Sequence, residues 1–151
     1  MRIHIGSDHA GLELKAELVK HLSSKGHLVT DHGPHEYDAL DDYPDFCIPA
    51  VQAVAKDPLS LGIVLGGSGN GEQIAANKVK GIRAALAWSI GTAKLAKEHN
   101  NANVVAVGGR MHEISLVKEI IDAFIGEPFS NDERHVRRIK KISDFENKSC
   151  C

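Results

Sequence analysis

Short apolar segments alternate with amphipathic segments along nearly the whole chain, and this alternation constrains the fold more than any other feature. The apolar segments have the length of β-strands and fall at residues 2–7, 27–31, 61–65, 83–87 and 103–107. Between them apolar residues recur at helical spacing, as Leu14, Leu18 and Leu22 do every four residues. Strands that alternate with helices predict a parallel sheet joined by right-handed crossovers. We therefore expect an α/β fold of three layers, with a five-stranded parallel sheet between helices and a further helix at the C-terminal end.

The length of 151 residues and the hydrophobic content of 42% predict a single domain over residues 1–151 that needs no disulfide or metal to fold. The last residues, from about 147, read as a polar tail that contains Cys150 and Cys151. Cys47 lies among apolar residues, where a small buried side chain is expected rather than a reactive thiol.

Charge and hydropathy exclude several classes of partner. The 18 basic and 20 acidic residues leave a net charge of −2, which disfavours a nucleic-acid partner. No apolar stretch approaches the ~20 residues that cross a bilayer, and the N-terminus has no apolar leader. We expect a soluble, cytoplasmic protein without a membrane partner.

Polar residues follow the predicted strands at the points where ligands bind in open parallel sheets. Asp8 and His9 follow the first strand, Trp88 and Ser89 the fourth, and Arg110 the fifth. These residues also have alternative structural roles, since Asp8 can simply cap the first helix and Ser89 is expected to cap the helix after the fourth strand. The convergence of these residues on one edge predicts a binding site there.

The glycine-rich turn after the third strand is the strongest local signal. Closely spaced glycines let backbone N–H groups approach an anionic oxygen, although the same residues also suit a tight turn. The helix that follows the turn is expected to run through Lys78. Glu72 comes in its first turn, where it either favours the helix dipole or accepts a proton beside those N–H groups. This pairing is what a base and an enolate-like intermediate require.

Two further groups have both a structural and a functional interpretation. His99 and Asn100 end the predicted fourth helix, where a histidine also complements the helix dipole. Arg134 and Arg138 share a face of the last helix and suit a phosphate, but they also fit a solvated basic surface.

Other chemistries lack essential residues. The turn has neither the dinucleotide pattern nor the lysine of a nucleotide-binding P-loop. Ser68 lacks the spacing of a hydrolase nucleophile. Nine histidines are scattered without the spacing of metal ligands, so we expect no metal site.

Several segments together resemble the ribose-5-phosphate isomerase B family over nearly the whole chain. The matching segments are residues 6–11, 42–44, 66–78, 98–101, 108–111 and 134–138. The resemblance implies a Rossmann-like fold, a homodimer or dimer of dimers, and interconversion of ribose 5-phosphate and ribulose 5-phosphate through an enediolate, in the non-oxidative pentose phosphate pathway. It implies no cofactor.

The resemblance also implies residue roles. Glu72 looks like the base that moves a proton between C1 and C2, and His99 like the group that assists opening of the sugar ring. The backbone of Gly67, Ser68, Gly69, Asn70 and Gly71 would hold the oxyanion. Asp8, His9 and Asn100 resemble contacts to the sugar, Tyr43 would line the pocket, and Arg110, Arg134 and Arg138 resemble phosphate contacts. Residues of the final helix are expected to reach a site in the second subunit.

The sequence is compatible with more than one substrate and with a non-catalytic role. One branch of the family uses a cysteine directly after the third strand as the base, whereas this chain has Gly66 there and resembles the glutamate-using branch. An isomerase of a hexose 6-phosphate, such as allose or galactose 6-phosphate, shares the scaffold. A non-catalytic sensor of a phosphate ligand would need the glycine turn and the arginines but not Glu72 or His99.

Overall fold

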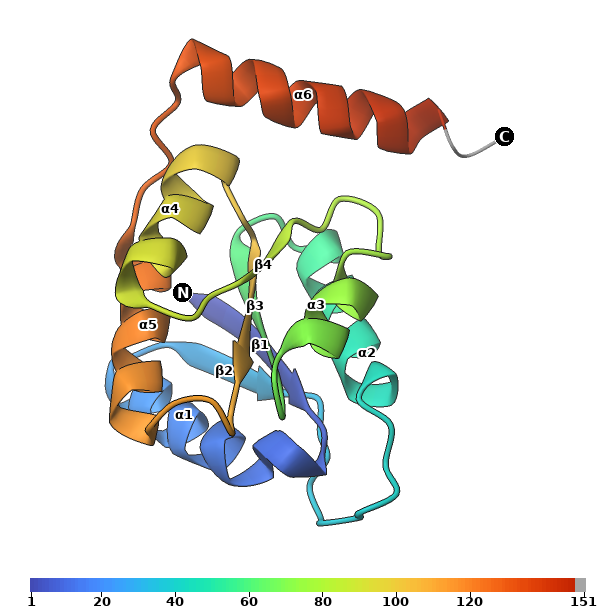
Figure 1. Ribbon diagram of the computed structural model, residues 1–151, viewed down its shortest axis with the longest axis vertical. Helices are drawn as coiled ribbons and strands as arrows, with labels where there is room; N and C mark the ends of the chain where they lie inside the picture. Colours follow the sequence, from blue (N-terminus) through green and yellow to red (C-terminus); the bar gives the residue numbers. More distant parts are fainter. Residues whose placement is uncertain (149–151) are drawn as a thin grey trace.

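A five-stranded parallel sheet forms the centre of the computed structural model, which describes residues 1–148 (Figure 1). The strand order is β2-β1-β3-β5-β4 and every neighbouring pair is parallel. The strands are β1 Arg2–Ser7, β2 Leu28–Asp31, β3 Ser60–Gly66, β4 Ala84–Leu86 and β5 Val104–Gly108. This confirms the predicted α/β class and the five strands, with β4 shorter than expected.

Helices cover both faces of the sheet, as a parallel sheet requires. α1 Leu12–Ser24, α4 Ile90–Asn100 and α5 Ile114–Gly126 pack on one face, and α2 Pro44–Lys56 and α3 Asn70–Ala76 on the other (Figure 1). Every residue of β3 is buried, because this strand lies between β1 and β5 and under helices on both sides. Each fully buried Ile or Leu in these two layers contributes roughly 1.5–3 kcal/mol to folding.

The last helix, α6 Glu133–Lys148, lies across one end of the molecule rather than on the sheet (Figure 1). His135 is its buried residue, while Val136, Ile142 and Phe145 remain exposed. The helix extends through residues 147 and 148, which the sequence suggested were already part of a polar tail. Cys150 and Cys151 lie outside the described residues.

Hydrogen bonds show where α4 begins and where α3 ends. Ser89 caps α4 through a reciprocal bond pattern with Thr92, as the sequence predicted. α3 ends at Ala76 with Asn77 as its cap, so the helix is shorter than the predicted one, which reached Lys78. Within the described residues, no helix has both the length and the apolar character needed to span a membrane.

Candidate active site

The carboxyl ends of β1, β3 and β5 lie side by side and bring the predicted residues to one rim. In the register, Ser7 is opposite Leu65, and Gly66 is opposite Gly108. Asp8 and His9, the glycine turn, and Arg110 therefore follow directly from adjacent strands. The rim predicted from the sequence is thus present in the fold.

The glycine turn is held in place by the loop after β5. Gly109 N–H donates to Gly66 O over 2.7 Å, and Arg110 N–H donates to Gly67 O over 3.1 Å. Gly69 has a φ of +82°, and a Cβ there would come within 2.7 Å of Leu86 Cδ1. A glycine is required at residue 69 for both reasons.

Glu72 occupies the first turn of α3 and is buried, with 4% of its surface exposed. Its carboxylate lies against Gly66, where a Cβ would collide with Oε1. Burial raises the pKa of this carboxyl, and the nearby charge of Asp8 raises it further, against the opposing effect of backbone N–H groups of Glu72 and Gly69. A carboxylate with a raised pKa is a stronger base, as proton abstraction near neutral pH requires.

Cys47 of α2 is fully buried near this carboxylate. Burial raises the pKa of the thiol well above its usual range, and the charges of Glu72 and Asp8 add to the effect. The thiol therefore stays protonated and packs as a small apolar group, as the sequence indicated.

Tyr43 and Ser68 border the glycine turn. The ring of Tyr43 lies against Gly71, where a Cβ would come within 2.8 Å of the hydroxyl oxygen. Ser68 Oγ accepts hydrogen bonds from the backbone N–H and the side-chain amide of Asn70. Arg110 is exposed, and its Cδ and Nη1 lie near Gly67. These side chains surround the turn on its open side.

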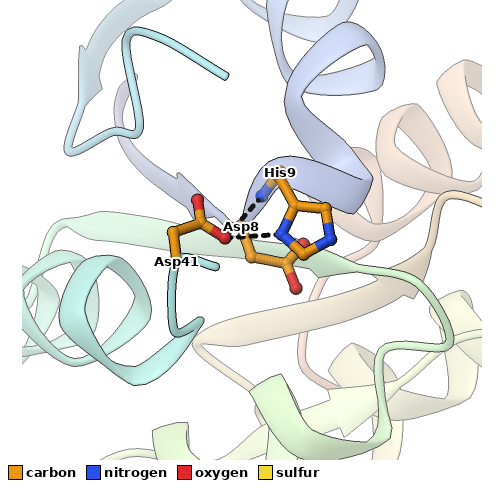
Figure 2. A group of neighbouring side chains, drawn as sticks. All are labelled: Asp8, His9 and Asp41. Carbon is orange, nitrogen blue, oxygen red and sulfur yellow. Dashed lines mark hydrogen bonds and ion pairs between the residues drawn. The ribbon is translucent and has the colours of Figure 1, made fainter. Parts of the chain in front are cut away.

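Asp8 and His9 are fixed by hydrogen bonds that involve a residue missed in the sequence. Asp8 accepts from Ala10 N–H over 2.9 Å and so caps the first turn, its simple structural role. Asp41 Oδ1 lies 2.6 Å from His9 Nδ1 and accepts from His9 N–H over 3.1 Å (Figure 2). Asp41 belongs to an acidic stretch before α2, and only the fold brings it to His9.

Asp8, His9 and Asp41 are also the one group in the described part of the chain with three potential metal ligands close together. No spacing in the sequence indicates this group, because Asp41 is 32 residues from His9. Within the group, His9 Nδ1 and Asp41 Oδ1 bond directly to each other.

The other predicted site residues lie at the opposite end of the molecule. α4 begins after β4 and runs back along the sheet, so His99 and Asn100 at its end are roughly 15 Å of helix away from the rim. His99 stacks on His135 of α6 with ring centroids 4.4 Å apart. Arg134 and Arg138 are exposed on α6. One chain therefore does not bring His99, Asn100, Arg134 or Arg138 to Glu72.

Hollows occur at both places. One of about 170 Å³ lies at the rim and is lined by Ser68, Asn70 and Trp88, among others. Another of about 940 Å³ lies beneath α6 and is lined by Asn100, Ile142 and Phe145, together with residues of α3 and β4. The surface that lines the larger hollow is mainly apolar, and Glu72 is not among its lining residues.

Comparison with known proteins gives one consistent family. Residues 3–142 match the family described as Ribose/Galactose Isomerase. A protein of Mycolicibacterium paratuberculosis named ribose-5-phosphate isomerase B is 57% identical over 146 residues, which cover 97% of this chain and 92% of that protein. A galactose-6-phosphate isomerase subunit of Clostridium acetobutylicum is 43% identical over 145 residues, covering 96% of this chain and 83% of its own length.

Solved structures agree in fold. A ribose-5-phosphate isomerase B of Mycoplasma genitalium, crystallised with bound ribulose 5-phosphate, superposes with a TM-score of 0.94 at 45% identity. The match covers 97% of this chain and 96% of the other. A second enzyme of that name from Clostridium thermocellum gives a TM-score of 0.94 at 41% identity and covers 99% of both chains.

Proposed function

The chain belongs to the ribose/galactose isomerase family, and on that premise we propose that it interconverts D-ribose 5-phosphate and D-ribulose 5-phosphate. Relatives named for this reaction match nearly the full length of the chain. The observation that carries the proposal is the buried Glu72, whose pKa is raised and whose carboxylate lies beside a turn rich in backbone N–H groups.

In the proposed reaction, Glu72 removes the proton from C2 of the open-chain aldose and returns it to C1. The electron pair of the broken C–H bond forms the C1–C2 double bond of an enediolate, and negative charge moves to the carbonyl oxygen O1. Transfer of the hydroxyl proton from O2 to O1, together with protonation of C1, then leaves the carbonyl group at C2. The backbone of the turn at residues 67–71 would hold the oxygen that gains the charge, because preorganised N–H donors lower the barrier of such a step most effectively. The reaction needs no oxidant, and we propose that it needs no metal or cofactor.

We further propose that each site is completed by a second copy of the chain. Glu72 and His99 lie at opposite ends of the folded subunit, so a ring-opening role for His99 requires another subunit at the rim. The same subunit would supply Asn100 to the sugar and Arg134 and Arg138 to the phosphate, beside Arg110. A homodimer, or a dimer of such dimers, would meet this requirement, and an isolated monomer would be inactive.

We propose that the sugar binds at the rim formed by the carboxyl ends of the strands. Asp8 and His9 would contact its hydroxyls and ring oxygen, and Tyr43, whose ring lies against Gly71, would line the pocket. A cytoplasmic location is part of the same proposal, since both sugar phosphates are intermediates of central carbohydrate metabolism.

A hexose 6-phosphate is the second candidate substrate. The relative from Clostridium acetobutylicum is named for galactose 6-phosphate, and one extra carbon changes only the length of pocket that is needed. The rim residues would perform the same proton transfer on either sugar.

The experiment is a turnover assay of the purified protein on a panel of aldose phosphates, with and without EDTA. We expect ribose 5-phosphate to be converted to ribulose 5-phosphate equally well in both conditions. Glu72→Gln should abolish turnover while binding of the sugar phosphate persists, and Glu119→Gln, on the exposed side of α5, is the matched control. Near-normal turnover by Glu72→Gln would remove Glu72 as the base, and loss of activity with EDTA would contradict the metal-free reaction.

A further inference from the structure

Asp41 is a buried carboxylate whose hydrogen bonds all go to one residue. Its side chain is 7% exposed, and among the described residues its carboxylate bonds only to the ring and the backbone N–H of His9. The second oxygen, Oδ2, is buried without a partner. A buried carboxylate normally has several donors, so its selective attachment to His9 calls for an explanation beyond stability.

The loop that carries Asp41 also contains an aspartate with an ordinary structural role. Asp38 is exposed, and its Oδ1 accepts a hydrogen bond from Leu40 N–H two residues on, which shapes the loop itself. The backbone N–H of Asp41 donates to Asp38 O over 3.2 Å, but its carboxylate makes no local bond and instead reaches a residue 32 positions away. The contacts of the carboxylate therefore act on His9 rather than on its own loop.

The geometry fixes the orientation of the His9 ring. Asp41 Oδ1 is 2.6 Å from Nδ1, and the same oxygen is bonded to the backbone N–H of His9, so the ring and main chain share one acceptor. Tyr37 meets the ring edge-on, with centroids 5.8 Å apart and planes at 81°. The second ring nitrogen points away from Asp41 (Figure 2).

A carboxylate accepts but cannot donate, so its partner nitrogen must carry a proton. In neutral imidazole only one nitrogen is protonated, and the hydrogen bond of one nitrogen thereby decides the state of the other. A bond from Nδ1–H to Asp41 leaves Nε2 with a free lone pair. Nε2 then accepts a hydrogen bond from a hydroxyl group.

We infer that Asp41 is a positioning residue for the isomerase reaction, which holds His9 as the Nδ1–H tautomer so that Nε2 accepts a hydrogen bond from a sugar hydroxyl. The inference rests on the proposed function, in which His9 contacts the sugar. It assigns a role to a residue that itself does not touch the substrate. It also explains why a carboxylate remains at a buried position with an unsatisfied oxygen.

The first test needs no substrate. Nitrogen-15 NMR of the histidine rings in the ligand-free protein, above the pH range in which histidine titrates, should show His9 as the Nδ1–H tautomer. In Asp41→Ala the signal should change to the Nε2–H form, which free imidazole side chains prefer, whereas Asp38→Ala should leave it unchanged. A wild-type Nε2–H signal, or an unchanged tautomer in Asp41→Ala, would overturn the inference.

The second test is a double-mutant cycle on turnover. Asp41→Ala should lower kcat/KM by about tenfold to a hundredfold, the range expected when a hydrogen bond to a charged group is lost. Combined with His9→Gln, Asp41→Ala should add almost no further loss, because it acts only through that ring. An equal loss in both backgrounds would show that Asp41 merely supports the fold.

The two proposals fail in different ways. If the wild-type protein does not turn over ribose 5-phosphate, the proposed function fails while the NMR result still reports on the pair. If turnover is normal in both the wild type and Asp41→Ala, only the role of Asp41 is lost.

Discussion

The carboxylate of Glu72 lies against the Cα of Gly66, in the space that a side chain at residue 66 would occupy. Gly66 is the last residue of β3 and Glu72 is in the first turn of α3, so the glycine turn folds the proposed base back onto the strand it follows. This contact gives a physical reason why a base supplied from residue 72 goes together with glycine at residue 66.

Replacing Gly66 by alanine should therefore displace the Glu72 carboxylate. The added methyl group collides with Oε1, and we expect kcat to fall by about a hundredfold or more, since misplacement of a catalytic group by about 1 Å has effects of that size. Steady-state kinetics measure this loss. Gly81→Ala is a control for glycine substitution, because no atom lies near the added Cβ there, although its φ of +82° costs some stability. Normal kcat in Gly66→Ala would mean that the observed position of Glu72 is not the active one.

The pH dependence of turnover should follow the carboxyl of Glu72. Only the ionised form accepts a proton, so kcat/KM should fall as pH drops through the raised pKa of this group. Burial is the main cause of the shift and the charge of Asp8 adds to it. Asp8→Asn should therefore move the acid limb of the pH profile to lower pH, whatever its effect on the plateau. A limb that stays in place would exclude Asp8 as a contributor.

The same pKa predicts a stability gain in Glu72→Gln. The folded-state pKa lies above the value of 4.5 for an exposed group, so between these two values the folded protein binds more protons than the unfolded chain. The free energy of unfolding therefore falls as pH rises through this window. Glutamine has no charge to bury, so the variant should be more stable than the wild type at neutral pH and lose this advantage in acid. Urea unfolding at the two pH values measures the difference, and a variant less stable at neutral pH would contradict it.

Mixing two inactive variants should restore activity if sites are shared between subunits. Glu72 and His99 lie at opposite ends of the folded subunit, so a shared site would combine Glu72 of one subunit with His99 of the other. A dimer of a Glu72→Gln chain and a His99→Asn chain would then contain one site with both native residues. Random re-association of equal amounts should give about a quarter of the wild-type sites. Turnover of ribose 5-phosphate measures the recovery.

The matched control for that experiment uses two changes at the same rim. A mixture of Glu72→Gln and Gly66→Ala chains has a damaged base in every site and should recover nothing. Recovery in neither mixture would place His99 and Glu72 in the same subunit's site or remove His99 from catalysis.

Lys15 should stabilise the loop that brings Asp41 and Tyr43 to the rim. Its side chain is 2% exposed, and Nζ lies 2.6 and 2.8 Å from the two oxygens of Asp31 and donates to Pro34 O. Lys15→Met leaves Asp31 without this partner, and we expect a loss of about 2–3 kcal/mol, below the full range for a buried pair because Asp31 is partly exposed. Lys20→Met, at an exposed pair with Glu17, should change stability by less than about 1 kcal/mol. Thermal or urea unfolding measures both variants, and equal losses of stability in Lys15→Met and Lys20→Met would contradict the larger effect expected for the buried pair.

Local sequence patterns determined the class of fold and the order of strands and helices along the chain, and they led to the chemistry proposed for the glycine turn. Hydrophobic periodicity and capping depend on neighbours a few residues apart, and for this reason Ser89 and the strand of residues 61–65 were predicted correctly. The ends of β4 and α3 shifted by one or two residues, because Asn77 bonds to the backbone of Ala84 and thereby ends one element beside the start of the other.

Contacts between distant segments were decided by the tertiary structure alone. The pairing of Asp41 with His9 spans 32 residues and has no periodic signal, since it depends on where the loop before α2 passes the end of β1. The separation of His99 from Glu72 follows from α4 running antiparallel to the strands, which puts its last residues at the edge opposite the carboxyl ends of the strands, where Glu72 lies. Sequence patterns identify residues with suitable chemistry, but only packing in three dimensions determines which of them meet.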